Sequence, residues 1–134
     1  MRKDAREVVY KVLYAQNFTS QFDDELFAAL QQEFKLNDAD KDFSRKLLNT
    51  IVENYDELTE IIGQLSLNYM LERVYLTDKC ALLIGLCEMK YFDDVPNIVA
   101  IDEALSLCKK YSTEKSLSFV NGIFAKYKSI IEKV

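Results

Sequence analysis

The 134-residue sequence predicts an all-α protein, and two observations carry that prediction. The chain has only three glycines and one proline, too few for the tight turns of a many-stranded β-protein. Its apolar residues recur at the spacing of an amphipathic helix almost throughout. No long linker or internal repeat interrupts the pattern, so we expect a single domain of about seven helices.

The first helix follows from an apolar stripe through residues 5–16. This stripe leaves three basic residues at the exposed start of the helix: Arg2, Lys3 and Arg6. A second helix is expected from Asp23, as N-cap, to Phe34. Residues 37–38 are then expected to begin the next helical segment.

The next stripe runs from residue 43 to residue 65, which is long for one globular helix. We therefore predict a break near residues 53–56, with Asn54 or Asp56 capping a new helix. Thr77 or Asp78 is expected to begin the helix after that. Residues 80–89 are apolar on nearly every side and predict a central helix packed all round, with Gly85 tolerated for close helix packing.

Pro96 is expected to lead into the sixth helix, where its missing N–H does no harm. Ser112 and Thr113 are expected to cap the seventh. The predicted buried face of the sixth helix consists of Ile98, Ile101, Ala104, Leu105, Cys108 and Tyr111. That of the seventh consists of Leu117, Val120, Ile123, Phe124, Tyr127 and Ile131.

The chain has no histidine, which excludes Ser-His-Asp and Cys-His catalysis and any imidazole metal site. It also has no P-loop or dinucleotide fingerprint, and its paired acids are adjacent, so they point about 100° apart on a helix. The three cysteines form no C-x-x-C pair and indicate buried thiols in a reducing compartment. We expect no catalytic residue, metal or cofactor.

The chain opens in charged amphipathic sequence without a signal-peptide core, and its longest apolar run, residues 80–87, is too short for a bilayer. These features indicate a soluble, cytoplasmic protein. Charge is unevenly distributed: residues 1–16 carry net +2, residues 109–134 net +4 and residues 17–108 net −11. We expect the first and last helices to lie side by side and to merge both basic ends into one cationic face on an acidic body.

Aromatic residues accompany the basic ends. Tyr10 and Tyr14 lie four apart on the first helix, while Tyr111 and Phe119 flank Lys115. Basic side chains next to aromatic rings are typical of single-stranded RNA binding. RNA phosphates attract the cationic side chains, and unstacked nucleobases stack on the aromatic rings. The alternative is that Tyr14 and Phe119 pack in the core and that Tyr111 seals the end of its helix.

Several short motifs in the last third of the chain form a recognisable pattern, and two further motifs near the N-terminus belong to it. It consists of Val-Pro at 95–96, Val-Ala-Ile-Asp-Glu-Ala at 99–104, Ser116 and Phe-Val-Asn-Gly at 119–122, with Glu88 upstream, Ala-Arg-Glu at 5–7 and Val-Leu-Tyr at 12–14. Together these stretches resemble the NusB family of bacterial antitermination factors. The resemblance spans essentially the whole chain, but asparagine is usual in the family where Asp102 stands, and its opening arginine run is here Arg-Lys-Asp at 2–4.

The resemblance implies two packed three-helix-like bundles, the N-terminal one over about residues 1–53 and the C-terminal one over about residues 54–134. It implies binding to the boxA element of nascent ribosomal RNA together with ribosomal protein NusE, within the antitermination complex of RNA polymerase. By motif position, the residues implied in RNA binding are Arg2, Lys3, Arg6, Lys11, Tyr14, Tyr111, Lys115, Phe119 and Asn121. Those implied in NusE binding are Glu72, Arg73 and Asp78, and some relatives form homodimers.

Two other functions stay open at this point. One is a protein-interaction adaptor with little RNA affinity of its own. The other is an RNA-binding accessory to a separate RNA methyltransferase, because the family's domain also occurs at the front of such enzymes.

Overall fold

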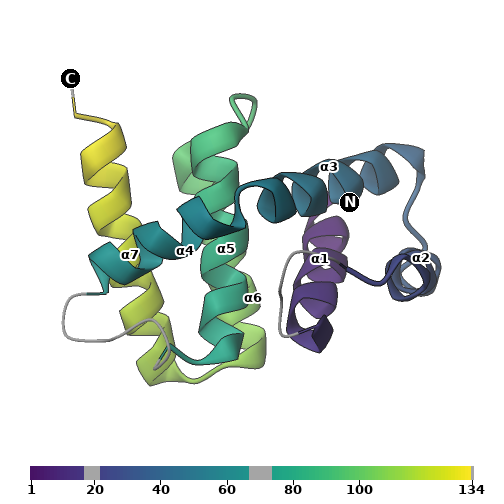
Figure 1. Cartoon of the computed structure of the whole chain (residues 1–134), viewed down its shortest axis with the longest axis horizontal. Helices are drawn as coiled ribbons and strands as arrows, with labels where there is room; N and C mark the ends of the chain where they lie inside the picture. Colours follow the sequence, from purple (N-terminus) through teal and green to yellow (C-terminus); the bar gives the residue numbers. More distant parts are fainter. Residues whose placement is uncertain (17–21, 67–73, 134) are drawn as a thin grey trace.

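Seven helices make up the computed structural model within the residues it describes, 1–16, 22–66 and 74–133 (Figure 1). They are α1 (Arg2–Gln16), α2 (Asp24–Glu33), α3 (Asp38–Glu53), α4 (Tyr55–Leu65), α5 (Leu76–Tyr91), α6 (Asn97–Tyr111) and α7 (Glu114–Ile131). These described ranges contain no strand. The all-α class and the count of seven helices are therefore confirmed.

Short polar side chains cap three of the helices. The carboxylate of Asp23 accepts hydrogen bonds from the backbone N–H groups of Glu25 and Leu26 at the start of α2. Asn37 caps α3 in the same way, and Thr113 caps α7. Each cap satisfies backbone donors that have no partner within the helix. The predicted starts of α2 and α7 are confirmed.

The break between α3 and α4 lies at Asn54, inside the predicted range. The predicted cap is wrong, because neither Asn54 nor Asp56 caps α4 through its side chain. The Asn54 side-chain amide instead donates 2.8 Å back to the carbonyl oxygen of Thr50, so it belongs to the end of α3. The start of α5 is Leu76, one residue before the expected Thr77.

Helix α5 is the centre of the fold, as its apolar sequence predicts. Residues 80–89 are all buried, and α1, α3, α4, α6 and α7 pack around the helix. Gly85 allows the closest of these approaches: a Cβ atom there would lie 2.4 Å from the Phe124 ring and 3.0 Å from Ala104 Cβ. The three thiols, Cys80, Cys87 and Cys108, are free and buried, as predicted.

The predicted inner faces of α6 and α7 are correct in the middle of each helix and wrong at one end. Ile101, Ala104 and Cys108 are buried, whereas Ile98 is 61% exposed. Ile131, the last residue of α7, is 38% exposed. Both lie in the terminal turns of their helices, where the residues at apolar spacing face solvent.

The first and last helices do not lie side by side, so that expectation is wrong. Within the part of the chain that the structure describes, α1 packs on α2, α3, α5 and α6, and α7 packs on α4, α5 and α6. Figure 1 shows α1 and α7 on opposite sides of α5 and α6. The physical reason is that α5 is apolar all round and needs neighbours on every side. Helix α6 packs on both α1 and α7 and therefore lies between the two basic ends of the chain.

Candidate nucleic-acid interface

Arg6 is buried, although the apolar stripe of α1 predicts an exposed position. Its guanidinium binds both carboxylate oxygens of Glu88, with Nη2–Oε1 at 2.7 Å and Nε–Oε2 at 2.8 Å. Burial raises the pKa of the Glu88 carboxyl, and the hydrogen bonds and charge of Arg6 oppose that rise. A buried carboxylate needs such a partner, which is why Arg6 turns inward. The prediction that Arg6 is an exposed phosphate contact is therefore corrected.

Arg2 lies on the side of α1 that faces α3. Its Nη2 is 3.1 Å from Asp94 Oδ2, and its guanidinium carbon lies 4.3 Å from the centre of the Phe43 ring. It lines a cavity of about 340 Å³ together with Asp42 and Lys46 of α3. The hydrogen bond from Arg2 lowers the pKa of the Asp94 carboxyl, and Asp94 partly neutralises the charge of Arg2.

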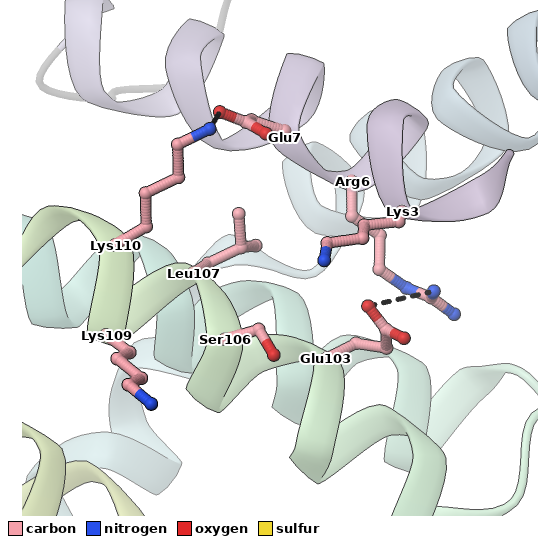
Figure 2. A pocket seen from close by; sticks show the side chains of 8 residues that line it. All are labelled: Lys3, Arg6, Glu7, Glu103, Ser106, Leu107, Lys109 and Lys110. Atoms are coloured by element: carbon pink, nitrogen blue, oxygen red, sulfur yellow. Dashed lines mark hydrogen bonds and ion pairs between the residues drawn. The ribbon is translucent and has the colours of Figure 1, made fainter.

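Lys3 lies on the other side of α1, at a cavity of about 320 Å³ between α1 and α6 (Figure 2). The lining residues come from these two helices: Lys3, Arg6, Glu7, Glu103, Ser106, Leu107, Lys109 and Lys110. Four of these residues are basic and two are acidic. Arg6 reaches the cavity only at its edge, where Nη1 lies 4.0 Å from Glu103. The exposed cations of this cavity are lysines of α1 and α6.

Glu7 joins α1 to the end of α6. Its Oε2 lies 2.6 Å from the Lys110 ammonium and also accepts a hydrogen bond from the Tyr111 hydroxyl. Burial disfavours the charged carboxylate, but these two hydrogen bonds and the charges of Lys110 and Lys11 outweigh it and hold the pKa of Glu7 below its usual 4.5. The Glu7 side chain is only 9% exposed, whereas that of Lys110 is 58% exposed.

A second cavity, of about 540 Å³, lies between α6 and α7. Ser106 and Lys109 line both this cavity and the one beside α1. The second cavity is also lined by two acids, Asp102 of α6 and Glu114 of α7, and by Ser118 and Asn121 of α7, of which Asn121 is one of the candidate RNA residues. The two hollows therefore form a continuous surface from Lys3 across Lys109 to Asn121, which we call the α1–α6–α7 face.

The aromatic candidates have different surroundings. The Tyr111 ring stacks on Tyr10 with 4.9 Å between ring centres, so one of its faces is covered, which favours the alternative that Tyr111 seals its helix. Lys11 lies 5.8 Å from the centre of the same ring. Tyr14 is 49% exposed in the last turns of α1, so the core alternative does not hold for it.

On α7, Lys115 is exposed and Asn121 lies at the second cavity. Phe119 is partly buried and packs against the core, as its alternative interpretation expects. Residues two apart on a helix point about 200° apart, so Phe119 and Asn121 lie on different sides of α7. The structure brings Lys3 and Asn121 onto one face but does not bring Phe119 there.

The candidate NusE residues are less well placed. Glu72 and Arg73 lie outside the described residues. Asp78 is 2% exposed, and its Oδ1 accepts a hydrogen bond of 2.8 Å from the Ser112 hydroxyl. Its carboxylate joins the start of α5 to the end of α6, so the prediction that Asp78 is an exposed partner contact is corrected.

Sequence reasoning missed the residues that organise this face. Lys109 and Lys110 entered only as charges of a basic end, and Glu7 and Ser106 carried no assigned role. A local signal existed for the lysines, because both lie in the last turn of a predicted helix. Their position beside Lys3 depends on packing between α1 and α6 and has no local signal.

No group of three or more Cys, Asp or Glu side chains could hold a metal ion in the described ranges. In the same ranges no helix is long and apolar enough to cross a membrane.

Residues 3–129 match the NusB family. The transcription antitermination protein NusB of Chloroherpeton thalassium is 36% identical over 98% of this chain and 64% of its own length, so the chain spans just under two thirds of that relative. The corresponding protein of Finegoldia magna is 32% identical over 91% of this chain and 89% of its own. A solved complex of antitermination factors NusB and NusE with dsRNA contains a chain that superposes with a TM-score of 0.83 at 28% identity, covering 96% of both chains. Because the family match covers residues 3–129 of 134, this chain belongs to the NusB family.

Proposed function

We propose that this protein is an RNA-binding transcription antitermination factor that acts together with NusE in the cytoplasm and has no enzymatic activity. Its RNA ligand is the single-stranded boxA element of nascent ribosomal RNA, presented to the antitermination complex of RNA polymerase. The names of the relatives and the NusB–NusE–RNA complex support this proposal.

The observation that carries the proposal is the α1–α6–α7 face. The chain has a net charge of −5, yet the exposed lysines Lys3, Lys109 and Lys110 gather at one cavity whose neighbour is lined by Asn121. The acids that line the two cavities are Glu7, Asp102, Glu103 and Glu114, so this surface is balanced in charge on an otherwise acidic protein. Lysines on an elongated, hollowed surface suit a phosphate backbone, because binding releases counterions from the RNA. In this proposal the RNA spans the N-terminal bundle, residues 1–53, and the C-terminal bundle, residues 54–134.

Individual roles follow from exposure and position. Lys3, Lys11, Lys109 and Lys115 contact phosphates, and the exposed Tyr14 ring stacks on a base. Asn121 reads a base edge or the sugar from the second cavity. Glu72 and Arg73 belong to the NusE surface. NusE adds its own RNA contacts, so two weak surfaces on one strand give higher affinity than either alone.

The test is binding of labelled boxA RNA to this protein, to NusE and to the mixture, at two salt concentrations and with a scrambled RNA as control. We expect weak binding by this protein alone, tighter binding by the mixture, and loss of both at high salt. An adaptor without RNA contacts gives no signal alone, and its mixture binds no differently from NusE. That result would overturn the proposal.

A further inference from the structure

The α1–α6–α7 face contains an acid at the point where its lysines converge. Glu7 lies one helical turn from Lys3 and one turn from Lys11, and its carboxylate holds Lys110 at 2.6 Å. Figure 2 shows the Lys110 side chain extended from α6 toward Glu7, while the adjacent Lys109 points away from it. The two neighbouring lysines of α6 are therefore in different states: Lys109 faces solvent at the cavity and Lys110 is paired.

The pairing is built into the fold rather than a chance contact of two surface chains. The Tyr111 hydroxyl donates to the same Oε2 atom of Glu7, and the Tyr111 ring stacks on Tyr10. The Glu7 side chain is 9% exposed, so its position is fixed by packing. Lys110 is 58% exposed and reaches Glu7 from α6, along the cavity between the two helices.

We propose that Glu7 limits RNA affinity by occupying Lys110, so that the protein's own carboxylate stands where an RNA phosphate would otherwise draw that lysine. This inference rests on the proposed function, which it deepens. One ammonium group shared between a fixed carboxylate and a phosphate contributes little to RNA binding, because the carboxylate already neutralises it. Glu7 thereby keeps the contribution of this protein small and leaves tight binding to the complex with its partner.

The size of the effect follows from counterion release. One additional phosphate contact changes the slope of log affinity against log salt by about −0.7 for a single strand, which corresponds to roughly fivefold in affinity at about 0.1 M salt. Glu7→Gln keeps an oxygen that accepts from Tyr111 and removes only the charge. We expect this variant to bind boxA RNA about fivefold more tightly than the wild type, with a steeper salt slope.

Three further variants make the test specific. Glu60→Gln removes the same charge from an exposed position of α4, a helix that lines neither cavity, and should leave affinity within about twofold of wild type because screening by salt weakens distant charges. Lys110→Gln leaves the Glu7 charge without its ion-pair partner and should weaken binding by repelling the phosphates, and the double variant Glu7→Gln/Lys110→Gln should return close to wild type. If Glu7→Gln proves unfolded by circular dichroism, the double variant decides the matter, because a Lys110 that contacted phosphate in the wild type would leave the double variant about fivefold weaker.

The measured affinities distinguish failure of this inference from failure of the proposed function. Tighter binding by Glu7→Gln, with the double variant near wild type, supports the inference. Unchanged or weaker binding by folded Glu7→Gln, or a double variant about fivefold weaker than the wild type, overturns it while the RNA-binding function stands. If the wild type binds no RNA, alone or with NusE, the proposed function itself fails.

Discussion

Arg6 and Glu88, 82 positions apart in the chain, meet through three charge-assisted hydrogen bonds inside the core, two from Nε and one from Nη2 of Arg6. The pair joins the first helix to the central helix, and both side chains are at least 95% buried. Arg6 therefore stabilises the fold, and Lys3 of the same helix lies on the α1–α6–α7 face.

Arg6→Ala is expected to lower the free energy of unfolding by about 3–5 kcal/mol, because it leaves the buried Glu88 carboxylate without a partner. Arg2→Ala is the matched control: its pair with Asp94 is half-exposed, so its loss should cost no more than about 1 kcal/mol. Urea denaturation of both variants measures the difference. Equal effects of the two substitutions would contradict the structural role of Arg6.

Gly85→Ala should destabilise the protein by about 1–3 kcal/mol, because the added methyl group would overlap the Phe124 ring in the core. Gly63→Ala in α4 is the control, since a Cβ there meets no atom within 4 Å. That control should gain up to about 1 kcal/mol from helix propensity. Thermal unfolding of both proteins reports the sign, and a stabilised Gly85→Ala would mean that α5 and α7 are further apart.

The lowered pKa of Glu7 predicts a pH dependence of stability. A carboxyl group with a folded pKa below its unfolded value of 4.5 contributes stability above that value and loses it as pH falls through the folded pKa. Wild-type stability should therefore exceed that of Glu7→Gln at pH 7, and the gap should narrow below about pH 4.5. Urea titrations of both proteins from pH 7 to pH 3 measure the gap; a constant difference would argue against the ion pair.

Lys109→Gln should weaken RNA binding and make the slope of log affinity against log salt shallower by about 0.7, since this lysine lines both cavities of the α1–α6–α7 face. Lys133→Gln removes an equal charge beyond the end of α7, more than ten residues from Asn121, and should leave the slope unchanged. Fluorescence anisotropy over a salt series gives both slopes. Matching losses in the two variants would indicate a nonspecific effect of net charge.

Asp78→Lys is expected to destabilise the fold by more than about 3 kcal/mol, because a buried ammonium would replace the acceptor of Ser112. Asp78→Asn retains an oxygen acceptor and should cost far less. Circular dichroism melts distinguish the two variants. A well-folded Asp78→Lys protein would show that this end of α5 opens easily and would return Asp78 to the candidates for partner contact.

The sequence by itself determined the helices of this protein and most of their ends. Helical spacing, the polar caps Asp23 and Thr113, and the apolar run of α5 are local signals, because each depends on residues within one or two turns. Motif positions identified the family for the same reason, since they lie in sequence order.

Only the tertiary structure decided which charges are exposed and which ends of the chain meet. The local sequence places both Arg6 and Lys3 at the exposed start of the first helix. Arg6 is buried because it pairs with a carboxylate 82 residues away. The separation of α1 from α7 depends on α5, whose apolar surface needs helices on every side. The pairing of Glu7 with Lys110 spans 103 residues, and a periodicity of 3.6 residues carries no information about such a partner.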